Sequence, residues 1–120
     1  MRAARYYDRH DVRIEDVPEP ELAPGTVAVE VAWCGICGTD LHEYLEGPIF
    51  IPPAGHPHPL SGESAPVVIG HEFSGTVIAL GEGVDDLSVG ENVVIEPYII
   101  GDDVDTGPGS EYQLSKDMNF

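Results

Sequence analysis

The stretch from Thr26 to Leu45, TVAVEVAWCGICGTDLHEYL, decides the fold. Its first part, Thr26 to Trp33, places larger apolar side chains at alternate positions, which is typical of a β-strand. Proline and glycine (11 and 14 residues) divide the rest of the chain into short runs that are rich in strand-forming residues. The further predicted strands are Val12–Val17, Phe73–Leu80 and Asn92–Ile95. Many short strands between such turns predict a mainly β domain, either a sandwich or a barrel.

Three segments of the chain do not follow a strand pattern. Residues 40–45 predict one short helix, because Asp40 with Glu43 resembles a capping box at its start. The apolar residues that would share one face of this helix are Leu41, Tyr44 and Leu45. Residues 48–66 and 101–119 are irregular, and loops of that length in a compact domain are usually functional or disordered.

The composition excludes several classes of partner. Asp and Glu number 22 against 5 Lys and Arg, which gives a formal net charge of −17. Such a surface repels nucleic acids and anionic membranes, so neither is an expected partner. Adaptation to high salt and an ordinary solvated surface both explain the acidity. No window reaches the roughly 18 apolar residues of a membrane span, and the N-terminus lacks the apolar core of a signal peptide. We therefore expect a cytoplasmic protein.

Cys34 and Cys37 are the only two cysteines, and they are spaced as Cys-x-x-Cys. They follow a predicted strand and precede a predicted helix, as the reactive pair of a thioredoxin does. Thioredoxin-like folds require βαβ units and long helices, which this chain lacks, and Ile36 stands where that motif has proline. The alternative interpretation is that Cys37 binds a metal while Cys34 packs beside the site.

A second segment, Gly70-His71-Glu72, offers the donors that would complete a metal site. A lone histidine is usually structural, but His71 stands beside a carboxylate and directly after an apolar run. Cys37, His71 and Glu72 together supply sulfur, nitrogen and oxygen, and catalytic zinc uses about three such protein ligands plus a water. Thiolate and imidazole suit zinc better than magnesium or calcium. The long gap between Cys37 and His71 excludes a zinc finger.

Four segments of the sequence resemble the GroES-like catalytic domain of the zinc-dependent medium-chain dehydrogenases. They are residues 37–42, 70–72, 81–84 and 89–93. Residues 40–52 and 58–75 look most like the 2,3-butanediol dehydrogenase branch of that family, with sorbitol and threonine dehydrogenases as near cousins. The resemblance implies an irregular β-barrel with a short helix after Cys37. It also implies an alcohol dehydrogenase that oxidises a small alcohol or diol with NAD or NADP, as a homo-oligomer.

The resemblance implies a role for each candidate residue of the metal site. Cys37 and His71 would bind one catalytic zinc ion, and Glu72 would be a ligand or lie close to it. Asp40 would hydrogen-bond the histidine ligand and fix its tautomer.

The resemblance further implies a proton relay. Thr39 would hydrogen-bond the alkoxide of the substrate, and His42 would be the next group in the relay. An imidazole titrates near neutral pH and therefore suits this task. The hydride would pass to the nicotinamide.

Two departures from the family change what is expected. Most relatives carry four cysteines after the position of Pro97, whereas this chain has none there, so no structural zinc is expected and the aspartates of 102–105 are expected to be solvated. The chain also lacks a Gly-x-Gly-x-x-Gly fingerprint. Residues 1–120 are therefore expected to be part of a catalytic domain, truncated before its C-terminal part and before the Rossmann domain that binds the nicotinamide, and to be inactive alone.

Other interpretations stay open. A polyol or amino-alcohol dehydrogenase of the sorbitol or threonine type is one, and a non-catalytic GroES-like binding or assembly module is another. A zinc-free quinone or enoyl reductase of the same superfamily would lack the ligands that Cys37 and His71 offer. Of the remaining histidines, His56 and His58 are expected to lie in a plain loop, and His10 in a turn.

Overall fold

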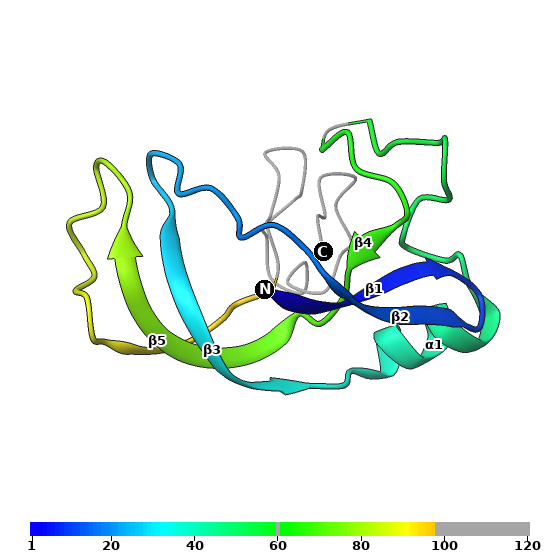
Figure 1. Ribbon diagram of the computed structural model, residues 1–120, viewed down its shortest axis with the longest axis horizontal. Helices are drawn as coiled ribbons and strands as arrows, with labels where there is room; N and C mark the ends of the chain where they lie inside the picture. Colours follow the sequence, from blue (N-terminus) through cyan, green and yellow to red (C-terminus); the bar gives the residue numbers. More distant parts are fainter. Residues whose placement is uncertain (60, 98–120) are drawn as a thin grey trace, which may run out of the picture.

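The computed structural model describes residues 1–59 and 61–97, which form six strands and one helix. In chain order these are β1 (Arg2–Asp8), β2 (Asp11–Asp16), β3 (Val27–Gly35), α1 (Gly38–Glu46), β4 (Val67–Val68), β5 (Glu72–Leu80) and β6 (Asn92–Val94). The strands form two antiparallel sheets, with orders β2-β1-β4 and β3-β5-β6. The sheet of β3 and β5 occupies one end of the molecule, and β1, β2 and α1 occupy the other (Figure 1).

The mainly β fold and the short helix after Cys37 are confirmed. The described strands form two open sheets and do not close into one barrel. The predicted strands correspond to β2, β3, β5 and β6 within one or two residues at each end. Strand β1 was not predicted, because its sequence RAARYYD has no clear alternation. The described residues between Gly47 and Pro66 form neither helix nor strand, as expected, and 101–119 lie outside the described residues.

Besides the passage from β2 to β3, the chain passes between the two sheets twice, and these two passages lie at the same place. The first leads from β3 through residues 36–37 to α1, which contacts β1. The second leads from β4, which pairs with β1, through residues 69–71 to β5. Because β3 and β5 pair along their length, the first passage leaves this strand pair beside the point where the second one enters it.

The alternation in β3 is interrupted by two irregularities in its pairing with β5, between Ala28 and Val29 and between Val31 and Trp33. A β-bulge inserts an extra residue and so changes which side chains face a given side. Trp33 is 81% exposed, and Val31 is exposed as well. The predicted alternation, with Val27, Val29, Val31 and Trp33 all on one side of the strand, is therefore broken at these two places.

The buried core of the described residues is small, as a short domain requires. Its members are Tyr6, Ala65, Val77 and, unusually, the charged Glu43. Tyr6 in β1 donates a hydrogen bond from its hydroxyl to the backbone carbonyl of Glu43 (3.2 Å). Burial, helped by the negative charge of Glu43, raises the pKa of Tyr6 to about 12. Tyr6 thus links the first sheet to α1.

Gly75 in the middle of β5 gives a direct test of the sheet of β3 and β5. A Cβ atom at this position would overlap the carbonyl oxygen of Glu30 and lie 2.6 Å from Cγ1 of Val29. We expect Gly75→Ala to destabilise the full-length protein by on the order of 1–3 kcal/mol, because backbone must move to relieve such overlap. The measurement is the thermal unfolding midpoint. Gly38→Ala is the matched control, since a Cβ there meets no atom within 4 Å, and an equal loss in both variants would contradict the prediction.

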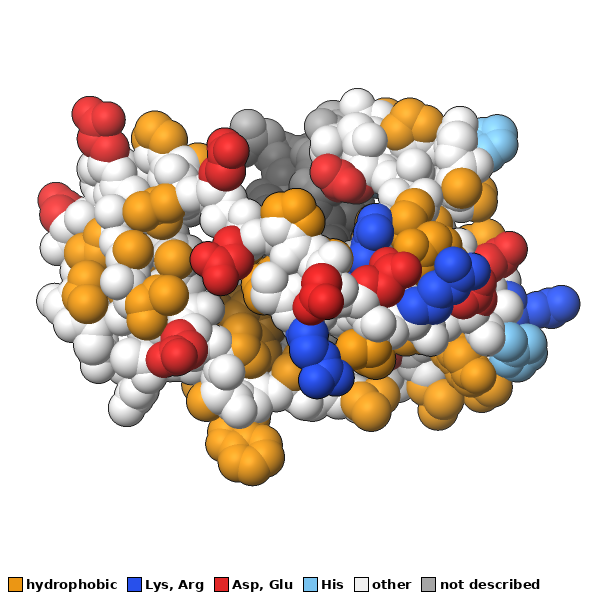
Figure 2. All heavy atoms as spheres, in the orientation of Figure 1, with side chains coloured by type: hydrophobic (Ala, Val, Ile, Leu, Met, Phe, Trp, Pro, Cys, Tyr) orange, Lys and Arg blue, Asp and Glu red, His pale blue; other side chains and the backbone are white. Residues whose placement is uncertain are grey.

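Acidic side chains are scattered over the face drawn in Figure 2, and the few basic ones gather over β1 and β2. Arg13 in β2 pairs with Asp11 at 2.7 Å and lies over the ring of Tyr7 at 4.0 Å. The hydrogen bond from Arg13 holds the pKa of Asp11 below its usual value. None of the helices in the described part of the chain has the length and apolarity that crossing a membrane requires.

Candidate metal centre

The pairing of β3 with β5 decides where the candidate site lies. Gly35, the last residue of β3, is paired with Glu72, the first residue of β5. Cys37 and His71 therefore lie just beyond the end of the strand pair, one in each of the two passages between the sheets. Residues that are distant in sequence are brought together by strand register alone.

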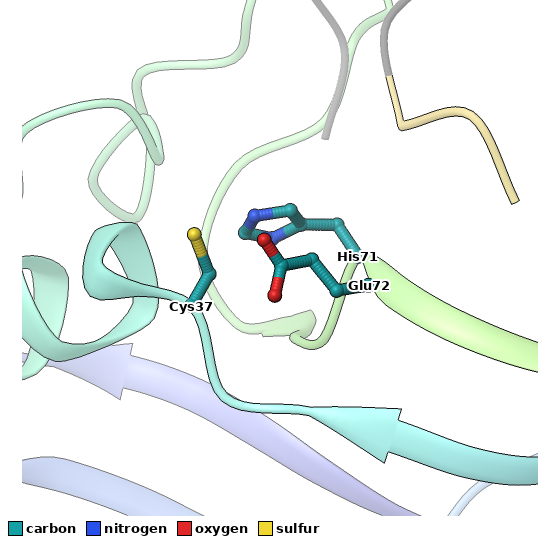
Figure 3. A group of neighbouring side chains, drawn as sticks. All are labelled: Cys37, His71 and Glu72. Carbon is teal, nitrogen blue, oxygen red and sulfur yellow. The ribbon is translucent and has the colours of Figure 1, made fainter.

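The three predicted ligands form a cluster. Sγ of Cys37, a ring nitrogen of His71 and a carboxylate oxygen of Glu72 all lie within 4.8 Å of one another. Their side chains converge from the start of α1 and from the segment that enters β5 (Figure 3). Cys37 and His71 are half-buried and Glu72 is exposed. No other group of three or more potential ligand residues occurs within residues 1–59 and 61–97.

Asp40 connects two members of the cluster. Its Oδ2 accepts a hydrogen bond from the backbone N–H of Cys37 at 2.9 Å, and its Oδ1 lies 3.5 Å from Nδ1 of His71. The predicted capping box of Asp40 with Glu43 is wrong. The helix begins at Gly38, earlier than predicted, with Cys37 as the N-cap residue, so Asp40 is the residue that bonds back to the cap.

Cys34 lies beside the cluster and is not a member of it. Gly70 has a φ of 106°, a conformation that favours glycine, and a Cβ there would lie 2.8 Å from Sγ of Cys34. Cys34 therefore packs against the backbone that leads into His71. Both cysteines are free thiols. Cys37 is therefore a member of the donor cluster, whereas Cys34 is exposed and lies outside it.

Thr39 and His42 lie on α1. Sγ of Cys37 is 3.6 Å from Oγ1 of Thr39, at the edge of hydrogen-bonding distance. Thr39, Asp40 and His71 line a cavity of about 140 Å³, whose other side is formed by parts of the segment 50–63 and by β4. His42 is exposed, one helical turn after Thr39, and does not line the cavity. The structure therefore places Thr39 at the cavity and His42 on the solvent-exposed surface of α1.

Glu43 also lines the cavity, and the sequence did not predict that this charged residue is buried. It is 2% exposed, and its carboxylate accepts hydrogen bonds from the backbone of Ile49, Phe50 and Ile51. The sequence carries no signal for this, because a glutamate on a short polar helix ordinarily faces water. His58 also lines the cavity and accepts a hydrogen bond from the backbone of Ser61 (3.3 Å), within the loop where it was expected.

Comparison with known proteins gives the family of the chain. The family described as "Alcohol dehydrogenase GroES-like domain" matches residues 23–115, and the chain belongs to it. The chain is 74% identical over its whole length to the (R,R)-butanediol dehydrogenase of Neisseria gonorrhoeae, of which it covers 34%. It is 52% identical over its whole length to the (R,R)-butanediol dehydrogenase of Bacillus subtilis, of which it covers 33%. The chain therefore spans about a third of the length of these curated relatives.

Solved structures agree with this family. The crystal structure of 2R,3R-butanediol dehydrogenase from Bacillus subtilis matches 82% of the chain with a TM-score of 0.77 and 57% identity, and the match covers 28% of that protein. An alcohol dehydrogenase from Escherichia coli CFT073, solved with NADH, matches 82% of the chain with a TM-score of 0.63 and 32% identity, over 25% of its own length. The predicted resemblance to this dehydrogenase family is confirmed.

Proposed function

We propose that Cys37, His71 and Glu72 form the catalytic zinc centre of an NAD- or NADP-linked dehydrogenase that oxidises a small vicinal diol of the 2,3-butanediol type. The observation that carries the proposal is the convergence of one sulfur, one nitrogen and one oxygen donor within 4.8 Å. The similarity to two (R,R)-butanediol dehydrogenases supports the choice of substrate.

The donor set fits zinc. A thiolate, an imidazole and a carboxylate are all ordinary zinc ligands, and three protein ligands leave a position for a water or a substrate. Asp40 lies near Nδ1 of His71, which would keep the proton on that nitrogen and leave Nε2 free to coordinate. Asp40 also fixes the backbone at Cys37, so one carboxylate would orient two ligands.

Zinc, when bound, supplies Lewis acidity that lowers the pKa of a coordinated hydroxyl group. The residues of the chain would hold the substrate and transfer its proton. Thr39 lines the cavity beside the cluster, and its hydroxyl would accept the proton of the alcohol while releasing its own proton toward His42. His42, one helical turn further and exposed, would pass that proton to solvent. Both groups of this proposed proton path lie on the helix α1.

We further propose that residues 1–120 are part of the catalytic domain and that the nicotinamide binds elsewhere in the full-length protein. The printed sequence has no Gly-x-Gly-x-x-Gly fingerprint, and the relatives are about three times as long. These residues alone would then not oxidise a diol. The strongly negative charge argues against nucleic-acid and anionic-membrane partners. The similarity to alcohol and diol dehydrogenases supports a cytoplasmic, homo-oligomeric enzyme with small-molecule substrates.

Metal removal tests the proposed function. We expect the full-length protein to contain zinc in this site and to produce NADH or NADPH from 2,3-butanediol. Dialysis against a chelator should abolish the activity, and zinc should restore it where magnesium does not, because a thiolate and imidazole site disfavours magnesium. Zinc is counted by elemental analysis and activity by absorbance of the reduced cofactor. A protein that oxidises the diol equally well without metal would refute the zinc centre, and one that oxidises no alcohol would favour the assembly-module alternative.

A further inference from the structure

Glu43 is a charged residue held inside the protein. Only 2% of its surface is exposed, and burying an isolated carboxylate is costly unless its oxygens are fully hydrogen-bonded. Both carboxylate oxygens lie 3.1 Å from the backbone nitrogen of Ile49. Oε1 also accepts from the backbone of Phe50 and, at 3.0 Å, of Ile51. The carboxylate therefore ties three consecutive residues of the 48–66 loop to α1.

The backbone of Glu43 is itself fixed. Its carbonyl oxygen accepts hydrogen bonds from the hydroxyl of Tyr6 (3.2 Å) and from the backbone N–H of Gly47 (3.0 Å). A Cβ on Gly47 would overlap that carbonyl and lie 2.6 Å from Oε2 of Glu43, so the turn after α1 is packed without spare room. The carboxylate is thus a rigid anchor, set between the first sheet and the loop.

The anchored residues form one wall of the cavity beside the candidate metal centre. Phe50 and Ile51 line this cavity together with Thr39 and His71. An alcohol that reaches Thr39 would therefore contact an apolar surface whose position depends on the hydrogen bonds to Glu43. Hydrogen bonds to an ionised acceptor are roughly twice as strong as neutral ones, so loss of the charge would loosen the wall.

We infer that Glu43 is a positioning residue, which holds Phe50 and Ile51 against the substrate and so makes the enzyme prefer an alcohol with methyl groups over a smaller one. The inference rests on the proposed function. A methyl or methylene group in a fitted apolar pocket contributes roughly 10- to 200-fold in kcat/KM. A wall that is free to move would lose part of that factor.

The test compares two diols in the full-length enzyme. We expect Glu43→Gln to lower the ratio of kcat/KM for 2,3-butanediol to kcat/KM for 1,2-ethanediol about tenfold, largely through the KM for butanediol. The ratio is the informative quantity, because a smaller fraction of folded enzyme lowers both rates equally. Glu46→Gln is the control, since Glu46 ends the same helix, is exposed and loses the same charge. It should leave the ratio unchanged.

A double-mutant cycle shows whether Glu43 acts through the wall. Phe50→Ala should itself lower the ratio, and adding Glu43→Gln to it should lower the ratio little further, because the two changes remove the same contact. If Glu43→Gln does not fold, Glu43→Asp retains the charge but withdraws the carboxylate and takes its place in the cycle. Equal losses for both diols, or fully additive effects, would overturn the inference.

Amide hydrogen exchange provides a readout that does not require activity. Exchange at 49–51 should be faster in the Glu43 variant than in wild type and unchanged in Glu46→Gln. Unchanged exchange in the Glu43 variant would overturn the inference even if the enzyme is active. A wild-type protein that oxidises neither diol would instead refute the proposed function and the role of Glu43 in substrate selection. Amide hydrogen exchange at 49–51 would in that case still decide whether Glu43 holds the loop.

Discussion

A Cys37→Ser variant of the full-length protein is expected to lose most of its zinc, and its rate of diol oxidation is expected to fall by more than about 100-fold. Even residues that only hydrogen-bond a metal ligand change metal affinity or activity by roughly 10- to 100-fold, so loss of a ligand itself should cost more. The substitution exchanges a soft, charged sulfur for a neutral hydroxyl, which binds zinc poorly. His71 and Glu72 would remain in place, because strand register and not Cys37 sets their positions. Zinc per chain and the rate of NADH formation are the two measurements.

Cys34→Ser is the matched control for this prediction. Cys34 packs against the backbone at Gly70 and lies outside the cluster, so its replacement should cost only the 0.5–3 kcal/mol that is roughly typical of a point change. Zinc content and activity should stay close to those of wild type. Equal loss of zinc in the two variants would show that the thiols act as a pair and would contradict the assignment of Cys37 alone.

Thr39→Val is expected to lower kcat by roughly 10²- to 10⁴-fold, the usual contribution of a group that transfers a proton in the reaction. Valine has nearly the shape of threonine, so the cavity keeps its volume and only the hydroxyl is lost. Zinc content should not change, because the hydroxyl of Thr39 lies beside the cluster without belonging to it.

Thr39→Ser separates the loss of the hydroxyl from a change of packing. Serine retains the hydroxyl and should restore most of the activity that Thr39→Val loses. A Thr39→Val enzyme with the kcat of wild type would show that no proton passes through this residue. An equally inactive Thr39→Ser enzyme would show that the methyl group, and hence packing, is what matters.

The sequence predicted those parts of the fold that depend on local pattern. Strand β3 was found from the alternation after Thr26, and α1 from the change of pattern at Asp40. Strand β1 was missed because Arg2–Asp8 mixes charged and aromatic residues, and it becomes a strand through its pairing with β2 and β4. The irregularities in β3 were missed for the same reason, since a bulge depends on the register of the partner strand.

The chemistry of the candidate site was readable because ligand types are a property of the residues themselves. Cys37, His71 and Glu72 are the donors that zinc accepts wherever the fold places them, and the register of β3 against β5 then brings them together. Glu43 shows the opposite case. Its burial depends on three amides of a later loop turning toward it, and no local pattern records that arrangement.

The two neighbouring passages between the sheets give the candidate site a mechanical consequence. Cys37 lies in one passage, and His71 and Glu72 lie at the end of the other. An ion bound by all three residues would therefore cross-link the two passages. In an unfolded chain these donors are far apart, so such an ion would bind only the folded state and stabilise it by mass action. Without the metal, the two sheets would then be freer to move relative to each other at their junction. Resistance to proteolysis would therefore increase when metal is added and decrease when it is removed.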